Sequence, residues 1–263
     1  MNKLLPLVLL AACGGPDTQP APDVLAQIRT EKDRLALLVD QEIYRASGDG
    51  TTFAGIISGT FPWACDLVKQ AQFDDGSFAR SVAHKERGDR DFSRDAAIGI
   101  LWSVKAGCLD TPQVVKFVDF VNKHDCLSTQ CDAKAETNTG FRTLIQHVTK
   151  LDVVWTSPVG ASWLPWGQHF FNDGSELFLD YASVYLYDRS MDAKDEANPF
   201  YQFVAGDKAK AADLLLPLMQ DIQGPAECYN GDCSYLRWQL QWEDGEDYRP
   251  EELVWMAKLL GGS

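Results

Sequence analysis

The chain has 263 residues, with 24 Lys and Arg against 38 Asp and Glu, so its formal net charge is −14. Such a field repels phosphate backbones and anionic lipid surfaces, which argues against nucleic-acid binding. Beyond the first 22 residues the chain is ordinary globular material of roughly 240 residues, which fits one large domain with a sizeable core.

The first residues, MNKLLPLVLLAAC, carry one early positive charge, Lys3, followed by an apolar run. The run at residues 4–10 is too short to span a bilayer as a mature helix. It ends in LAAC, residues 10–13, which closely resembles the lipobox of bacterial lipoproteins. The resemblance implies cleavage after residue 12, lipidation of Cys13 and a membrane anchor. The alternative is an ordinary secretory signal whose cleavage site contains a cysteine by chance.

A lipidated Cys13 would place the domain in the bacterial cell envelope, in the periplasm or on the cell surface. Gly14 follows it, where an Asp would often indicate inner-membrane retention, so the outer membrane is slightly favoured. Residues 13–22, CGGPDTQPAP, contain Gly, Pro and polar residues with nothing to bury, and we expect a flexible tether there. Residues 23–263 then form the domain.

Six cysteines remain after Cys13, and an even number in an exported protein predicts disulfides. Two pairs, Cys126 with Cys131 and Cys228 with Cys233, each enclose four residues rich in turn formers. Cys65 and Cys108, near the ends of apolar segments, are then the third pair among the possible pairings. Zinc binding is the rival interpretation, but neither local pair has the two-residue zinc spacing, so we expect no metal.

Helical periodicity dominates the rest of the chain, and no sustained alternating strand pattern is present. Ser93 is the expected N-cap of one apolar helix, and Thr111 with Pro112 is expected to begin another. Residues 72–91 are expected to be a polar loop. The prediction is an all-α domain with helices at residues 24–46, 51–71, 93–107, 111–123, 140–151, 175–187, 207–223, 235–242 and 250–260.

Apolar helices alternate with more amphipathic ones, as a two-layer ring of helical hairpins requires. Three stretches, GDGTTFAGI at 48–56, DDGSFAR at 74–80 and FSRDAAIGILWSV at 92–104, resemble segments of the α/α-toroid, six-hairpin proteins. That group includes many glycoside hydrolases and polysaccharide lyases. The resemblance implies a single toroid-like domain. Because the chain is short for six hairpins, we expect an incomplete ring.

Working groups of toroid enzymes lie where inner helices begin, so the resemblance implies that Asp49, Arg94 and Asp95 converge there. Asp95 and Asp49 are the candidate catalytic carboxylates, since glycoside hydrolysis needs an acid and a base or nucleophile. Arg94 is the candidate clamp for a substrate carboxylate. The alternative is structural: Asp49 caps a helix or serves a turn, and Arg94 pairs with Asp95.

An aromatic-rich connection, residues 155–174, contains Trp163, Trp166 and His169. Flat aromatic faces suit sugar rings, and His169 is a candidate base for a lyase-type reaction. Aromatic residues also give a long loop the area that it needs to bury itself, and that alternative is the simpler one.

Known catalytic and cofactor motifs give little help with the chemistry. The sequence has no Gly-x-Ser-x-Gly elbow, P-loop or dinucleotide fingerprint, so we expect no cofactor and no serine hydrolase, kinase or Rossmann activity. The interpretation favoured at this point is a lipid-anchored envelope protein that binds or cleaves a carbohydrate at the ring mouth. The alternative is a non-catalytic envelope lipoprotein with a protein or glycan partner.

Overall fold

The computed structural model describes residues 18–132, 135–137, 139–153, 186, 199–222 and 250–261. These residues form helices joined by turns, and they contain isolated β-bridges but no strand, which confirms the all-α prediction for this part of the chain. The helices are α1 Pro22–Ala36, α2 Gln41–Ala46, α3 Gly50–Ile57, α4 Pro62–Ala71, α5 Val82–Glu86, α6 Arg94–Lys105, α7 Thr111–His124, α8 Thr139–Thr149, α10 Pro199–Val204, α11 Lys208–Asp221 and α12 Pro250–Leu259.

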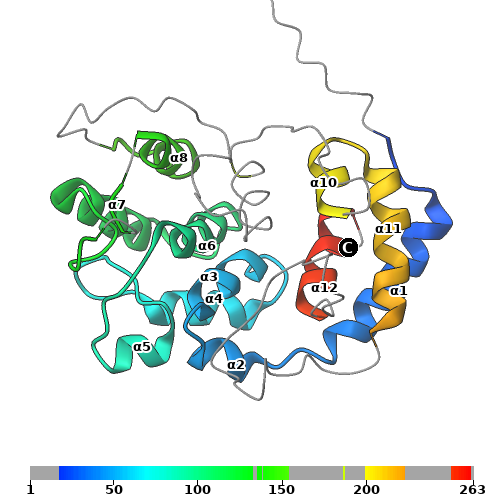
Figure 1. The fold of residues 1–263 in the computed structure, drawn as a ribbon, viewed down its shortest axis with the longest axis horizontal. Helices are drawn as coiled ribbons and strands as arrows, with labels where there is room; N and C mark the ends of the chain where they lie inside the picture. Colours follow the sequence, from blue (N-terminus) through cyan, green and yellow to red (C-terminus); the bar gives the residue numbers. More distant parts are fainter. Residues whose placement is uncertain are drawn as a thin grey trace, which may run out of the picture.

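The described helices form two neighbouring groups (Figure 1). The first and last parts of the chain lie together, with α1 packed against α11 and α12, and α10 against α11. Helices α2 to α8 form the other group, which is centred on the pair α3 and α6. The two groups meet where α12 contacts α3.

The centre of the core is the contact between α3 and α6. A Cβ atom added to Gly55 would lie 2.1 Å from the carbonyl oxygen of Gly99, and one added to Gly99 would lie 2.1 Å from the carbonyl oxygen of Thr52. Only glycine permits the two backbones to approach this closely. The close approach lets the backbones of α3 and α6 pack directly against each other.

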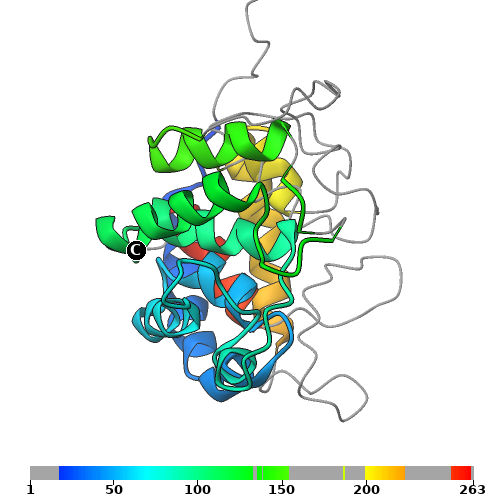
Figure 2. The same cartoon turned by 90° about the vertical axis from the view of Figure 1, so that its left-hand side faces the viewer.

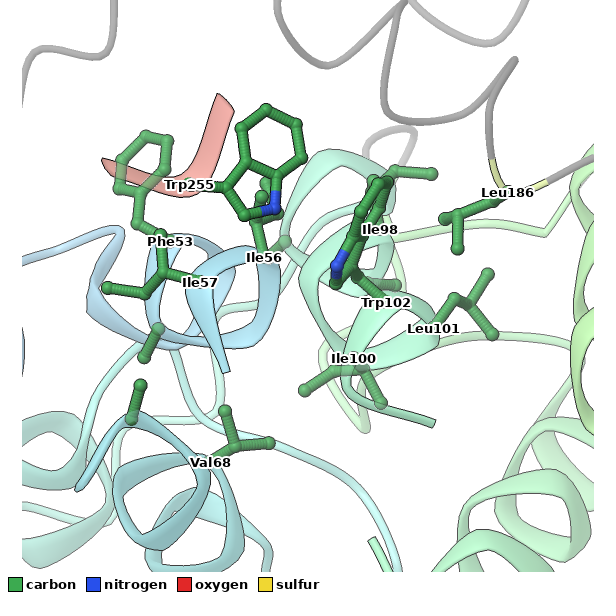
Figure 3. Packing of buried hydrophobic residues seen from close by; sticks show 14 of the residues in the cluster. Phe53, Ile56, Ile57, Val68, Ile98, Ile100, Leu101, Trp102, Leu186 and Trp255 are labelled. Carbon is green, nitrogen blue, oxygen red and sulfur yellow. The ribbon is translucent and has the colours of Figure 1, made fainter. Parts of the chain in front are cut away.

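Aromatic side chains continue the core from this pair to α12. Figure 3 shows Trp255 beside Phe53 of α3 and Trp102 of α6. The rings of Trp102 and Trp255 meet edge to face with centroids 5.1 Å apart, and Phe200 of α10 stacks on Trp255 at 5.3 Å. This cluster joins the two helix groups through large buried apolar area.

Two long helices of the sequence prediction are each divided in the structure. The segment 24–46 forms α1 and α2, because the carboxylate of Asp40 accepts a hydrogen bond from the N–H of Glu42 at 3.0 Å and begins a new helix. The segment 51–71 forms α3 and α4. Phe61, which precedes Pro62, has extended backbone, as the residue before a proline prefers.

Three further details differ from the prediction. Helix α10 lies in a segment for which no helix was predicted. The polar loop at 72–91 contains the short helix α5, which has Ser81 as its N-cap. Helix α7 is capped by Asp110, not Thr111, in a reciprocal capping box with Gln113. The expected helices at 175–187 and 235–242 lie outside the described residues, apart from residue 186.

Two of the expected disulfides are present. Cys65 of α4 is bonded to Cys108, which follows α6, and Cys126 is bonded to Cys131 just after α7. These are the predicted pairings. Cys228 and Cys233 lie outside the described residues, as do Cys13 and the segment before it.

Within the residues that the structure describes, no helix has the length and apolarity needed to cross a bilayer.

Candidate functional site

Arg80 joins the N-terminal ends of the two central helices. Its Nη1 donates to Oδ1 of Asp49, the N-cap residue of α3, at 2.9 Å. Its Nε donates to Oδ2 of Asp91 at 2.9 Å, and its Nη2 donates to Oγ of Ser93, the N-cap residue of α6, at a longer 3.4 Å. We call Asp49, Arg80, Asp91 and Ser93 the Arg80 cluster.

The backbone places Arg80 between these ends. Its carbonyl oxygen accepts a hydrogen bond from the N–H of Thr51 at 2.7 Å, in the first turn of α3. Gly50 is required at this point, because a Cβ there would lie 1.9 Å from the carbonyl oxygen of Tyr44. The side chains of Arg80 and Asp49 are 18% and 28% exposed, so their ion pair is partly shielded from water. Partial burial strengthens a charge pair relative to an exposed one.

Ser93 is the N-cap residue of α6, as predicted, and Asp49 is the N-cap residue of α3, but neither side chain accepts a capping hydrogen bond from its own helix. Both side chains turn to Arg80 instead. The N-terminus of α3 keeps its favourable interaction with the carboxylate of Asp49, because a negative charge suits a helix N-terminus.

A second ion pair lies along the same loop. Nη1 of Arg90 donates to Asp75 at 2.6 Å and to Ser77 at 3.1 Å, and its guanidinium lies 4.1 Å from the ring centre of Phe73. Burial alone would raise the pKa of Asp75, but hydrogen bonds from Ser77 and the pairing with Arg90 outweigh it and hold that pKa below the usual value. This pair fixes the loop that carries Arg80.

Ser81, His84 and Asp89 have the residue types of a catalytic triad, but Ser81 is the N-cap residue of α5. Oγ of Ser81 lies 2.8 Å from Nδ1 of His84, and Nε2 of His84 lies 3.9 Å from Asp89. Ser81 is buried, and its Oγ accepts the backbone N–H of His84 at 3.3 Å, which begins α5. Burial first, and then the charge of Arg87, lower the pKa of His84. The hydroxyl therefore holds a neutral imidazole in place.

The predicted site residues fall into three groups. Asp49 belongs to the Arg80 cluster. Arg94 is the first residue of α6, and its Nη1 donates to the carbonyl oxygen of Glu136 at 2.9 Å. Asp95 follows in the first turn of α6, and its side chain is outside the described part of the structure. The residues Trp163, Trp166 and His169 also lie outside it.

The sequence analysis missed Arg80, the residue that connects the cluster. The available signal was its place at the end of DDGSFAR, beside an alternating run of charges at 85–91. Among the described residues, no group of three His, Cys, Asp or Glu side chains could hold a metal ion.

Comparison with known proteins adds no relative: no protein-family model, curated protein or solved structure matches this chain.

Proposed function

We propose that this protein is a lipid-anchored component of the bacterial cell envelope whose helical domain binds a carbohydrate without cleaving it. The proposal that the domain does not cleave its ligand rests on the ion pair between Asp49 and Arg80, whose atoms are 2.9 Å apart. This pair engages the side chain of Asp49 with Arg80 at the start of α3, which supports a structural role for this candidate carboxylate.

Carbohydrate binding is supported by the three toroid-like stretches and by the aromatic residues Trp163 and Trp166. The arrangement of α3 and α6 is compatible with two inner helices of an incomplete α/α-toroid. Both are apolar, they pack side by side, and their N-terminal ends meet at Arg80. In such a ring, the loop before α6 would be at the end where toroid proteins bind their ligands.

The anchor is supported by the LAAC sequence at residues 10–13. Expression of the full chain in a bacterium with a labelled fatty acid tests this part. We expect acylation at Cys13 and recovery in the membrane fraction, and Cys13→Ser is expected to abolish both. Unlabelled protein released from the membrane would contradict the anchor.

The carbohydrate part is tested with a soluble chain of residues 18–263. Binding of peptidoglycan fragments and other oligosaccharides is followed by calorimetry, and their chain lengths are followed by chromatography. We expect binding with no change in chain length. Shortened products that disappear in Asp49→Asn or Asp95→Asn, but persist in Asp33→Asn on the exposed face of α1, would show that the protein is an enzyme.

A further inference from the structure

The geometry of the N-terminal segment points to a fixed orientation on the membrane. We infer that the anchor holds the domain against a phospholipid surface, with the N-terminal end of α11 toward the headgroups and the Arg80 cluster facing away. The inference rests on the proposed lipidation of Cys13, and it adds which face of the domain meets the bilayer.

The folded part of the chain begins close to Cys13 in sequence. Thr18 donates through Oγ1 to Oδ1 of Asp207 at 2.5 Å, and its N–H donates to the carbonyl oxygen of Gly206 at 3.3 Å. Pro20 is buried, and α1 begins at Pro22. Much of the expected tether at 13–22 is thus attached to the domain, directly beside the first turn of α11.

The stretch of chain between Cys13 and the first described contact is therefore short. Only residues 14–17 separate Cys13 from Thr18. Even a fully extended chain of this length reaches at most about 18 Å. A domain of this size is about 45 Å across, by the usual scaling of compact domains. The tether is too short for the domain to turn its opposite side to the membrane.

The two ends of the domain can be followed in Figures 1 and 2. In both views the beginning of α11, in yellow, lies at the upper end, whereas α2 and α5 lie at the lower end. Asp49 comes three residues after the end of α2, and Arg80 precedes α5 by two residues. The chain segments beside α2 and α5 that carry Asp49 and Arg80 are therefore toward the end that a short anchor holds away from the bilayer.

Local charge is compatible with this orientation but does not determine it. Lys208 and Lys210 lie partly exposed in the first turn of α11, next to the attachment point of Thr18. Exposed Asp23, in the first turn of α1, opposes them. The proposed orientation rests on the length of the tether.

Amine-reactive footprinting of the acylated full-length protein on phosphatidylcholine vesicles tests the orientation. Mass spectrometry would compare labelling with that of the soluble chain 18–263 mixed with the same vesicles. We expect several-fold slower labelling of Lys208 and Lys210. Lys69 is the internal reference, because it is exposed in the last turn of α4, next to α5, whose Lys85 donates to the carbonyl oxygen of Gln70. Its labelling should not change.

A lengthened tether is the matched control. Insertion of about twelve Gly and Ser residues before Thr18 adds up to roughly 40 Å of reach and should restore labelling at Lys208 and Lys210. Failure of the protein to float with vesicles, or absence of an acyl mass on Cys13, would refute the lipid anchor itself. Floating protein with uniform labelling of all three lysines would overturn the orientation alone. Protection that persists with the long tether would overturn the tether as its cause.

Discussion

Arg80 has the largest set of charged contacts among the residues described for the loop before α6. Its guanidinium contacts Asp49 and Asp91 at 2.9 Å while its side chain is only 18% exposed. Removal of a partly buried charge leaves its partners desolvated without compensation, which costs more than loss of an exposed pair. The cluster therefore stabilises the packing of the N-terminal ends of α3 and α6 against each other.

Arg80→Met is expected to lower the free energy of unfolding by about 2 kcal/mol, because Asp49 would lose a shielded partner. The matched control is Arg45→Met, since Arg45 forms a more exposed pair with Glu86, with side chains 40% and 57% exposed. Its loss should stay within about 0.5 kcal/mol. Urea denaturation of the two variants measures both losses of stability. Equal losses in Arg80→Met and Arg45→Met would contradict the structural role of Arg80.

His84 is expected to make stability depend on pH. Burial and Arg87 lower its pKa in the folded protein, below the 6.5 of an exposed histidine. As pH falls through 6.5 the unfolded chain takes up a proton that the folded protein does not, so the free energy of unfolding decreases. The stability that the folded protein gains from a neutral His84 is fully present above pH 6.5. It is lost as the pH falls through the lowered pKa of His84 in the folded protein.

The measurement is urea denaturation of the wild type and His84→Gln at pH 7.5 and 5.5. The decrease on acidification should be smaller in His84→Gln. The lowered pKa values of Asp75 and Asp207 act in a separate window, below their ordinary 3.8, and do not interfere. An identical pH dependence in the two proteins would exclude His84 as the source.

At the scale of elements, the contact between α3 and α6 depends on the absence of side chains at two positions. Gly55 and Gly99 face backbone atoms of the opposite helix, which cannot move aside as a flexible side chain would. The interior is close-packed, so an added methyl group must separate the helices.

Gly99→Ala is expected to lower the free energy of unfolding by about 3 kcal/mol, despite the better helix propensity of alanine. Gly48→Ala is the control, because a Cβ at Gly48 meets nothing within 4 Å. Its stability should change by less than about 1 kcal/mol. Thermal and urea unfolding distinguish the two. A tolerated Gly99→Ala would mean that α3 and α6 can shift apart without loss.

At the scale of the whole molecule, contacts remote in sequence join the start of the chain to its end. Nη1 and Nη2 of Arg34 in α1 donate to the carbonyl oxygens of Ile222 and Met219 at the end of α11, at 2.8 and 2.6 Å. A cation at a helix C-terminus satisfies carbonyl groups that have no partner within the helix. The two disulfides add covalent links over very different sequence separations.

Replacement of both cysteines of a pair by serine should show this difference. Cys65 and Cys108 are 43 residues apart, and Cys126 and Cys131 only 5. On the chain-entropy model, loss of the longer loop costs about 4 kcal/mol and loss of the shorter loop about 2 kcal/mol. Denaturation of the two double variants measures both values, and the reverse order would contradict the entropic account for this protein.

The sequence by itself determined the features that depend on local patterns. Apolar periodicity predicted the segments that form most of the described helices, but not the short helices α5 and α10. Turn formers between Cys126 and Cys131 predicted their pairing, with Cys65 and Cys108 left to each other. It also placed Asp49 and Arg94 correctly at helix starts, because caps and first turns have local signatures. The breaks at 37–40 and 58–61 were missed, since the apolar spacing continues across them.

Only the tertiary structure decided which of these charged groups meet. Arg80 is 31 residues from Asp49 and 13 from Ser93, and no local pattern predicts a contact over such separations. The sequence paired Arg94 with Asp49 at a site, whereas the structure brings Asp49 to Arg80 and directs Arg94 to the carbonyl of Glu136. The attachment of Thr18 to Asp207, across 189 residues, is likewise decided by the packing of α1 against α11. Periodicity fixes which side of a helix is buried, but the partner of a polar side chain depends on which helix end packs beside it.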